Sequence, residues 1–210
     1  LNHLPVFTAF RRNDLMNNHS ASYAGYLGLN QHEGANDLIA ESDCLIVLGA
    51  RLDEPTTGDY RLAPVFPVDS DDELSRELNA ERGKKWIHIY PDFGALTAAP
   101  EADIRLAMTN KGFLDEVSDS YIVGEGLDNS WVKTCRASYE ASFNADFSAK
   151  YDAGLLGLPL LMRELVTMLP EDAIVTADAG NFTLWPQRFC RYARPGRLLA
   201  PVNGAMGYGV

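Results

Sequence analysis

The sequence predicts an α/β fold, in which a doubly wound, mostly parallel sheet is followed by the beginning of a second α/β domain. The 210 residues are 46% hydrophobic and 22% charged, as in ordinary globular domains. Short apolar runs recur along the chain, and segments that can form helices lie between them. Because a parallel strand pair requires a crossover long enough to hold a helix, this alternation indicates a doubly wound sheet.

Five apolar runs are the expected strands, and we expect them to be buried in parallel sheets. They comprise residues 4–8, 44–48, 86–90, 104–108 and 173–177. The last run follows the helix-breaking segment Pro170-Glu171-Asp172, so it begins the second α/β unit.

The expected helices lie between these strands or follow them. They comprise residues 31–41, 69–82, 112–121, 131–143 and 159–169. The second of these segments has leucines four positions apart among charged residues, which indicates an exposed amphipathic helix. In the last, Leu161, Leu165 and Met168 share one face, and Pro159 stands at the start, where proline is favoured.

These elements predict three parts of the chain. Residues 1–121 form a first domain whose first strand we expect to be missing, 122–157 form a linker on the surface, and 158–210 begin a second, truncated domain. The sequence opens on a strand without a starting Met and stops within a glycine-rich turn. We therefore expect both ends to be cut.

Composition excludes several kinds of partner. The 18 basic and 29 acidic residues give a net charge of −11, which repels nucleic acid and anionic membranes. No apolar run approaches the roughly 20 residues of a membrane-spanning helix, and the first residues lack the regions of a signal peptide. A cytoplasmic location is expected. Cys44, Cys135 and Cys190 are isolated and odd in number, so we expect buried free thiols and neither a disulfide framework nor a zinc site.

The first candidate site is Asp178-Ala179-Gly180-Asn181, directly after the strand at 173–177. Ligands of open α/β sheets bind beyond the carboxyl ends of strands, and glycine lets the backbone approach a phosphate closely. The four residues therefore suit a phosphate-binding loop. From these four residues alone, however, an ordinary turn in which Asp or Asn caps the next helix is favoured.

The second candidate site is the glycine-rich segment of residues 204–209. Its three glycines leave backbone donors and acceptors exposed, and Met206 supplies one bulky apolar side chain. A flat heteroaromatic ligand would suit such a segment. A turn before a buried helix would have the same pattern.

The third candidate site follows the strand at 44–48 and comprises Gly49, Ala50, Arg51 and Asp53. An arginine at the carboxyl end of a strand can bind a nucleotide diphosphate, or it can pair with Asp53 or another carboxylate. The sequence leaves both open. Residues 11–14, Arg-Arg-Asn-Asp, indicate a solvated loop.

Taken in order, these motifs resemble one family. The segments that carry the resemblance are Leu4-Pro5-Val6, Phe10-Arg11-Arg12, Tyr23-Ala24-Gly25, residues 42–52, Asp178-Ala179-Gly180-Asn181, Arg194-Pro195-Gly196 and residues 204–209. They resemble the Rossmann-like middle domain and the start of the cofactor-binding domain of thiamine-diphosphate-dependent enzymes of the acetolactate-synthase type. Several weak motifs in one order make this resemblance specific.

The resemblance implies where the cofactor binds. Gly180 and Asn181 fall where loop groups hold the diphosphate, and Phe182 stands beside them, where relatives often carry a polar residue. In the segment Gly204-Ala205-Met206, the first carbonyl would accept a hydrogen bond from the aminopyrimidine and the last amide would meet the pyrimidine ring. The Met206 side chain would wedge the cofactor into a bent conformation.

The resemblance also implies an activity. In the family the cofactor adds to a 2-oxo acid, carbon dioxide leaves, and the thiazolium stores the carbanion as an enamine. An acetolactate synthase decarboxylates pyruvate in this way and transfers the acetaldehyde unit. A simple 2-oxo acid or oxalyl-CoA-type decarboxylase and a non-catalytic nucleotide-binding module are the alternatives.

Parts of the family's active site are expected outside this chain. The glutamate that protonates the pyrimidine belongs to a domain before Leu1, and the Mg²⁺-binding motif follows Val210. The resemblance thus implies no catalytic residue and no metal ligand here, a fragment inactive by itself, and a complete enzyme that is a homodimer or homotetramer. FAD is a further candidate cofactor at Arg51 and Asp53, although Gly28-Leu29-Asn30-Gln31 departs from the Gly-Met-His-Gly segment of FAD-binding relatives.

Overall fold

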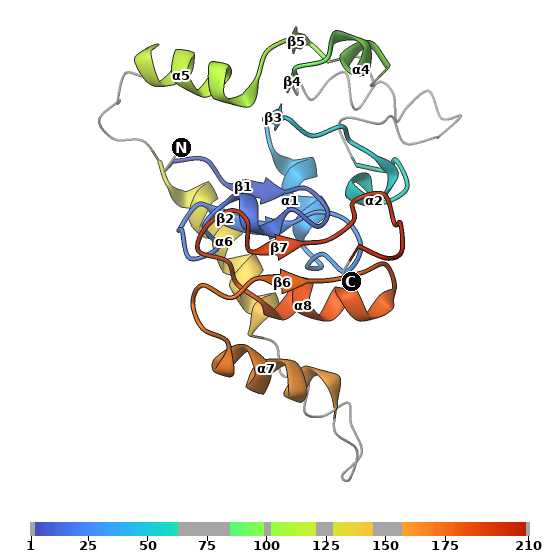
Figure 1. Cartoon of the computed structure of the whole chain (residues 1–210). Helices are drawn as coiled ribbons and strands as arrows, with labels where there is room; N and C mark the ends of the chain where they lie inside the picture. Colours follow the sequence, from blue (N-terminus) through green and yellow to red (C-terminus); the bar gives the residue numbers. More distant parts are fainter. Residues whose placement is uncertain (1–2, 63–84, 99–101, 121–127, 145–156, 209–210) are drawn as a thin grey trace, which may run out of the picture. The chain divides into compact units, whose positions relative to one another are not determined.

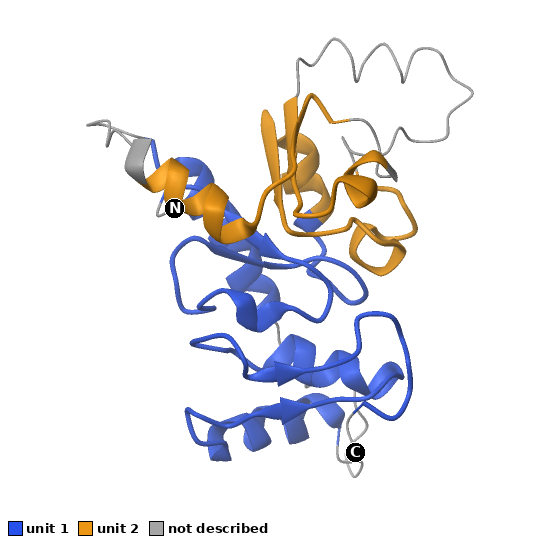
Figure 2. Cartoon of the chain, turned by 45° about the horizontal axis from the view of Figure 1, so that its top comes forward, with its two compact units in different colours: residues 1–35, 128–210 blue, residues 36–127 orange. Residues whose placement is uncertain are grey.

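A computed structural model of the chain describes residues 3–62, 85–98, 102–120, 128–144 and 157–208 (Figure 1). The chain divides into two compact units, one of residues 1–35 and 128–210 and the other of residues 36–127 (Figure 2). Every strand pair in the described residues is parallel, and helices follow the strands. The predicted α/β class is therefore confirmed. The helix predicted at 69–82 lies outside the described residues.

The unit of residues 36–127 contains a three-stranded sheet in the order β3-β4-β5. Its strands are β3 (Cys44–Leu48), β4 (Lys85–Ile89) and β5 (Ile104–Leu106). The helices around them are α1 (Ala35–Glu41), α2 (Glu54–Thr57), α4 (Phe93–Ala98) and α5 (Asn110–Ser120). Three predicted strands thus lie in one parallel sheet, with α4 in the β4 to β5 crossover.

The expected burial of these strands is only partly confirmed. In β3, Val47 is buried, whereas Cys44 is exposed and Ile46 keeps 43% of its surface accessible. Successive strand residues point to opposite faces. One face of β3 is therefore covered and the other is open, so the expectation that Cys44 is a buried thiol was wrong; Cys135 and Cys190 are buried as predicted.

The other unit begins with β1 (Val6–Thr8), the short helix η1 (Asn13–Leu15) and β2 (Tyr23–Tyr26). β1 and β2 pair in a two-stranded parallel sheet. Helix α6 (Ser130–Phe143) packs against β2, and its buried face carries Val132, Cys135 and Tyr139. The helix predicted at 131–143 is confirmed, whereas β2 was not predicted.

The same unit continues through a second α/β segment. Its elements are α7 (Leu158–Met168), β6 (Val175–Thr176), η3 (Asn181–Thr183), α8 (Leu184–Phe189) and β7 (Leu198–Leu199). β6 pairs with β7, and a core forms around Met162, Phe189, Tyr192 and Leu198. Helix α7 buries Met162, whereas the predicted apolar face of Leu161, Leu165 and Met168 remains exposed.

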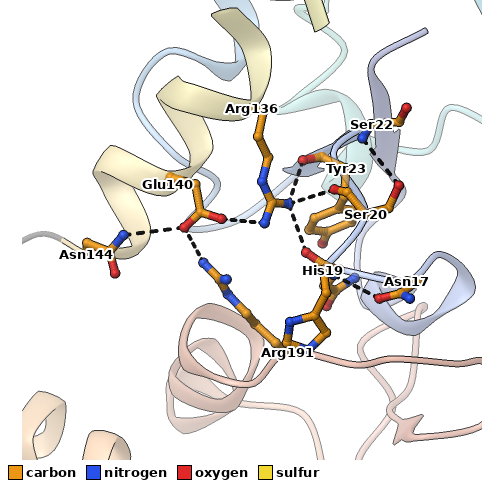
Figure 3. A network of polar contacts seen from close by, with 10 residues as sticks. Asn17, His19, Ser20, Ser22, Tyr23, Arg136, Glu140, Asn144 and Arg191 are labelled. Carbon is orange, nitrogen blue, oxygen red and sulfur yellow. Dashed lines mark hydrogen bonds and ion pairs between the residues drawn. The ribbon is translucent and has the colours of Figure 1, made fainter. Parts of the chain in front are cut away.

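A network of charged groups joins α6 to two distant segments (Figure 3). Arg136 donates from one nitrogen to the backbone carbonyls of Asn18, Ser20 and Tyr23, at 2.8, 3.1 and 3.1 Å. Its guanidinium also pairs with Glu140, whose other oxygen accepts from Arg191. Burial alone would raise the pKa of Glu140, but the hydrogen bonds and charges of the two arginines outweigh burial and lower it.

The segment after β1 is the main correction to the sequence analysis. Residues 11–14 were expected to form a solvated loop, yet Arg11, Asn13 and Asp14 are buried. Asn13 donates to the carbonyl of Gln187 at 3.0 Å, and the Asp14 carboxylate accepts from the amides of residues 197 and 198. Groups distant in sequence hydrogen-bond these polar side chains, and a local sequence pattern does not reveal such partners.

Within the described residues, no helix combines the length and the apolar character that crossing a membrane requires.

Candidate functional site

The first candidate loop starts at Asp178, just beyond the carboxyl end of β6. Its carboxylate accepts a hydrogen bond from the backbone amide of Ala179 at 2.7 Å. Gly180 follows with φ +133°, a conformation that side-chain-bearing residues rarely adopt. The chain then enters η3, where Thr183 bonds back to the Gly180 carbonyl through both its amide and its hydroxyl, at 3.2 and 2.9 Å.

The second candidate loop follows β7 and stays open to solvent. Gly204 and Gly207 have φ +73° and +88°, and nothing lies within 4 Å of the position that a Cβ would take at either. Met206 stands between them with 85% of its surface exposed. The Ala205 amide donates to Asn203 Oδ1 at 3.2 Å. This loop therefore offers exposed backbone and one exposed apolar side chain.

Asp178 brings the two loops together. Its carboxylate accepts from the amides of Gly207 at 2.8 Å and of Tyr208 at 3.4 Å, in addition to that of Ala179. These hydrogen bonds, first of all the one from Gly207, and then the charge of Arg11, hold the pKa of Asp178 below its ordinary value. Both segments that the sequence predicts to bind cofactor thus lie at one place.

The arrangement fits a ligand with a phosphate end and a flat ring. The open positions at Gly204 and Gly207 in the second loop let a ligand approach the backbone where a Cβ would stand in the way, whereas at Gly180 the Phe182 ring lies 3.0 Å from the position that a Cβ would take. In the second loop the Met206 side chain, 85% exposed, supplies apolar surface for a ring. No group of three His, Cys, Asp or Glu side chains among the described residues is placed to hold a metal ion.

Sequence reasoning missed one residue at this place, Arg11. Its side chain is buried and donates to the carbonyl of Pro201 at 2.6 Å and to Thr183 Oγ1 at 3.0 Å. Its backbone has φ +55°. Positive φ is uncommon for a residue other than glycine, but φ cannot be read from the sequence.

The third candidate site lies in the unit of residues 36–127. Arg51 is exposed, and its Nε donates to the Tyr90 hydroxyl at 2.8 Å. The Asp53 carboxylate accepts from the Thr56 amide at 3.1 Å and so caps α2. A Cβ on Gly49 would lie 2.2 Å from the side-chain nitrogen of Asn110. Close packing against Asn110 therefore explains why residue 49 is glycine, and capping of α2 explains the aspartate at position 53.

The sequence also carries a family signature over its first part. The sequence model of the thiamine pyrophosphate enzyme central domain matches residues 2–117, more than half of the chain. This chain belongs to the thiamine pyrophosphate enzymes. The resemblance deduced from the motifs is confirmed.

Curated relatives extend the likeness to the second part. The acetolactate synthase isozyme 2 large subunit of Escherichia coli is 27% identical over 192 residues, covering 90% of this chain and 30% of that protein. The sulfoacetaldehyde acetyltransferase of Rhodobacter capsulatus is 26% identical over 224 residues, covering 98% of this chain and 36% of that protein. The chain spans about a third of the length of these thiamine pyrophosphate enzyme relatives.

A solved structure supports the fold. An X-ray structure of a Mycobacterium smegmatis protein assigned to the thiamin diphosphate-dependent enzymes aligns with a TM-score of 0.62 over 98% of this chain and 34% of its own. The two sequences are 14% identical. The likeness therefore concerns the α/β architecture of the family.

Proposed function

We propose that this chain belongs to a thiamine-diphosphate-dependent 2-oxo acid decarboxylase or carboligase most like acetolactate synthase, with pyruvate as substrate. The observation that carries the proposal is the carboxylate of Asp178, which hydrogen-bonds the backbone of both candidate loops. The two loops that the family resemblance assigns to the two ends of one cofactor lie together. Family membership over residues 2–117 and relatives that cover nearly the whole chain support the same conclusion.

In this proposal the first loop holds the diphosphate end and the second holds the pyrimidine end. Gly180 and Asn181 face the diphosphate, with Phe182 beside them, and the Phe182 ring must turn away from Gly180 for a diphosphate oxygen to reach that backbone. The backbone of Gly204 and Ala205 and the amide and side chain of Met206 orient the ring. When bound, thiamine diphosphate supplies a nucleophilic carbon and a sink for the electrons left by decarboxylation. The described residues contribute orientation and binding.

The rest of the enzyme is part of the proposal. We assign residues 1–121 to the middle domain, 122–157 to the linker and 158–210 to the start of the cofactor-binding domain. The Mg²⁺ ligands and the catalytic glutamate come from segments outside these residues, and the complete cytoplasmic enzyme is a homodimer or homotetramer. Gly49, Ala50, Arg51 and Asp53 are retained as the place for FAD, and the exposed Arg51 guanidinium is the group available to a diphosphate.

Calorimetric titration of the complete natural polypeptide with thiamine diphosphate and Mg²⁺ tests the cofactor. We expect micromolar binding that Met206→Ala weakens about tenfold, since the side chain contributes apolar contact to the ring. Met168→Ala is the matched control, because Met168 is likewise exposed, at 79%, but lies on α7. Absence of binding to the folded wild-type polypeptide would refute the enzyme proposal and leave a nucleotide-binding module.

A second candidate activity is acetyl transfer like that of sulfoacetaldehyde acetyltransferase, because two relatives of that name align over 98% and 97% of this chain. Product analysis separates the two activities. Acetolactate from pyruvate supports the ligase, whereas an aldehyde alone supports a simple decarboxylase. Acetyl phosphate and sulfite formed in equal amounts from sulfoacetaldehyde and phosphate, with no product from pyruvate, would replace the first proposal by the second.

A further inference from the structure

Arg11 lies in a segment that the sequence predicts to be a solvated loop, yet its side chain is buried. The residue keeps 5% of its surface accessible and has φ +55°. Positive φ is uncommon for a residue with a side chain, and such strain persists where the surroundings impose it. The contacts of the side chain show what imposes it here.

The Arg11 guanidinium reaches one group on each side of the candidate site. Nη2 donates to Thr183 Oγ1 at 3.0 Å, and the same hydroxyl donates to the Gly180 carbonyl at 2.9 Å. Nη1 donates to the Pro201 carbonyl at 2.6 Å, just before the segment that holds Gly204 and Met206. One side chain therefore links the end of the first loop to the beginning of the second.

Charge reinforces this link. The positive charge of Arg11 acts on Asp178, whose carboxylate accepts from the Ala179 and Gly207 amides. Arg11 and Asp178 thus link the same two loops. Arg11 does so through the Pro201 carbonyl and the Thr183 hydroxyl, and Asp178 does so through the backbone amides of Ala179 and Gly207. Because a guanidinium presents several donors in a rigid planar fork, it can hold two acceptors at a fixed separation, which the single ammonium of lysine does less well.

We infer that Arg11 is a positioning residue for the cofactor, which sets the spacing between the loop at 178–183 and the loop at 202–208. This inference rests on the proposed function. Arg11 acts through Thr183 and the backbone at Pro201 and touches no reacting atom. Its contribution is preorganisation, because loops already held at the right spacing lose less entropy when the ligand binds.

The test compares Arg11→Lys, Arg11→Met and Arg12→Met in the complete natural polypeptide. Arg12 is the matched control, since it is the neighbouring arginine and is only half-buried. The dissociation constant for thiamine diphosphate with Mg²⁺ is measured by calorimetry well below the melting temperature of each variant, and the melting temperature is measured without cofactor. We expect Arg11→Met to weaken binding tenfold or more, Arg11→Lys to weaken it less, and Arg12→Met to change it less than about twofold.

Thr183→Val provides a second variant in case Arg11→Met does not fold. It removes the hydroxyl that links Arg11 to the Gly180 carbonyl and keeps a similar shape, and it should also weaken binding. The double variant Arg11→Lys with Thr183→Val should lose less than the sum of the two single losses, because both break one link.

The outcomes separate the inference from the proposed function. A wild-type polypeptide that binds no cofactor overturns both. Wild-type binding that survives Arg11→Met, with only the melting temperature lowered, assigns Arg11 a merely structural role and overturns the inference alone. Equal losses in Arg11→Met and Arg12→Met would reflect general charge and would also overturn it.

Discussion

The carboxylate of Asp178 accepts a hydrogen bond from the backbone amide of Gly207 over 2.8 Å, between residues 29 positions apart in the chain. A carboxylate that collects several amide hydrogen bonds gains from each, because its full negative charge strengthens them. Here the donors come from both loops of the candidate site. The Asp178 side chain of the first loop therefore holds the backbone of the second loop at Gly207 and Tyr208.

Asp178→Asn should weaken thiamine diphosphate binding by about tenfold. The amide side chain retains only one acceptor oxygen and no charge, so the hydrogen bonds to Ala179 and Gly207 cannot both persist at full strength. Calorimetric titration of the complete polypeptide measures the loss. Asp172→Asn is the control, since Asp172 is an exposed aspartate six residues earlier. If Asp178→Asn and the wild type bound thiamine diphosphate with equal affinity, the hydrogen bonds of Asp178 to the two loops would not affect cofactor binding.

The stabilisation that the Asp178 carboxylate provides by accepting hydrogen bonds from both loops should also depend on pH in a defined direction. Its pKa in the folded protein lies below the ordinary value of 3.8, first of all because of the hydrogen bond from Gly207. The stabilisation is therefore fully present above the ordinary pKa and is lost as the pH falls through the folded pKa. Carboxyl chemical shifts followed by NMR should show Asp178 titrating below pH 3.8. A titration midpoint at or above the ordinary value would contradict the prediction.

The charged network around Glu140 should stabilise the fold. Glu140→Gln should lower the free energy of unfolding by about 1–3 kcal/mol, because Arg136 and Arg191, at 18% and 19% side-chain exposure, would lose their shared carboxylate. Urea unfolding measures this change.

The exposed pair of Lys111 and Asp115 provides the comparison for that network. Their side chains are 83% and 59% exposed, so Asp115→Asn should change the free energy of unfolding by less than about 0.5 kcal/mol. If both substitutions had equal effects, the partial burial of the Glu140 network would contribute nothing.

Local patterns predicted much of the fold. The run Cys44–Leu48 forms a strand at the predicted bounds, because its length of five residues and its β-branched Ile46 and Val47 favour a strand over a helix. Strand β2 (Tyr23–Tyr26) was missed because it contains Gly25 at φ +111° and lacks a clear period. Its pairing with β1 and its packing against α6 make it a strand, and neither partner is adjacent in sequence.

For the candidate site, too, local patterns predicted one part and only the folded structure shows the other. Each loop carries its own glycine pattern, so the sequence could predict both Gly180 and Gly204. The links between the loops carry no such pattern. Arg11 and Thr183 lie 172 residues apart, and a buried arginine next to a second arginine has the composition of a solvated loop. Only the folded chain shows which of two neighbouring arginines turns inward.

Gly49 offers a last prediction, which bears on the proposed FAD site. Gly49 and Gly58 have φ +68° and +62°, so alanine at either carries the same left-handed backbone cost of roughly 1–2 kcal/mol. Only at Gly49 would the new Cβ meet a neighbour, since the Asn110 side chain lies 2.2 Å away, whereas nothing lies within 4 Å at Gly58. Gly49→Ala should therefore destabilise the protein by about 1–3 kcal/mol more than Gly58→Ala in urea unfolding.

Asn110→Ala in the Gly49→Ala background should recover most of that excess, because it removes the crowding atoms. If the excess persists in the double variant, contact with the Asn110 side chain is not its cause.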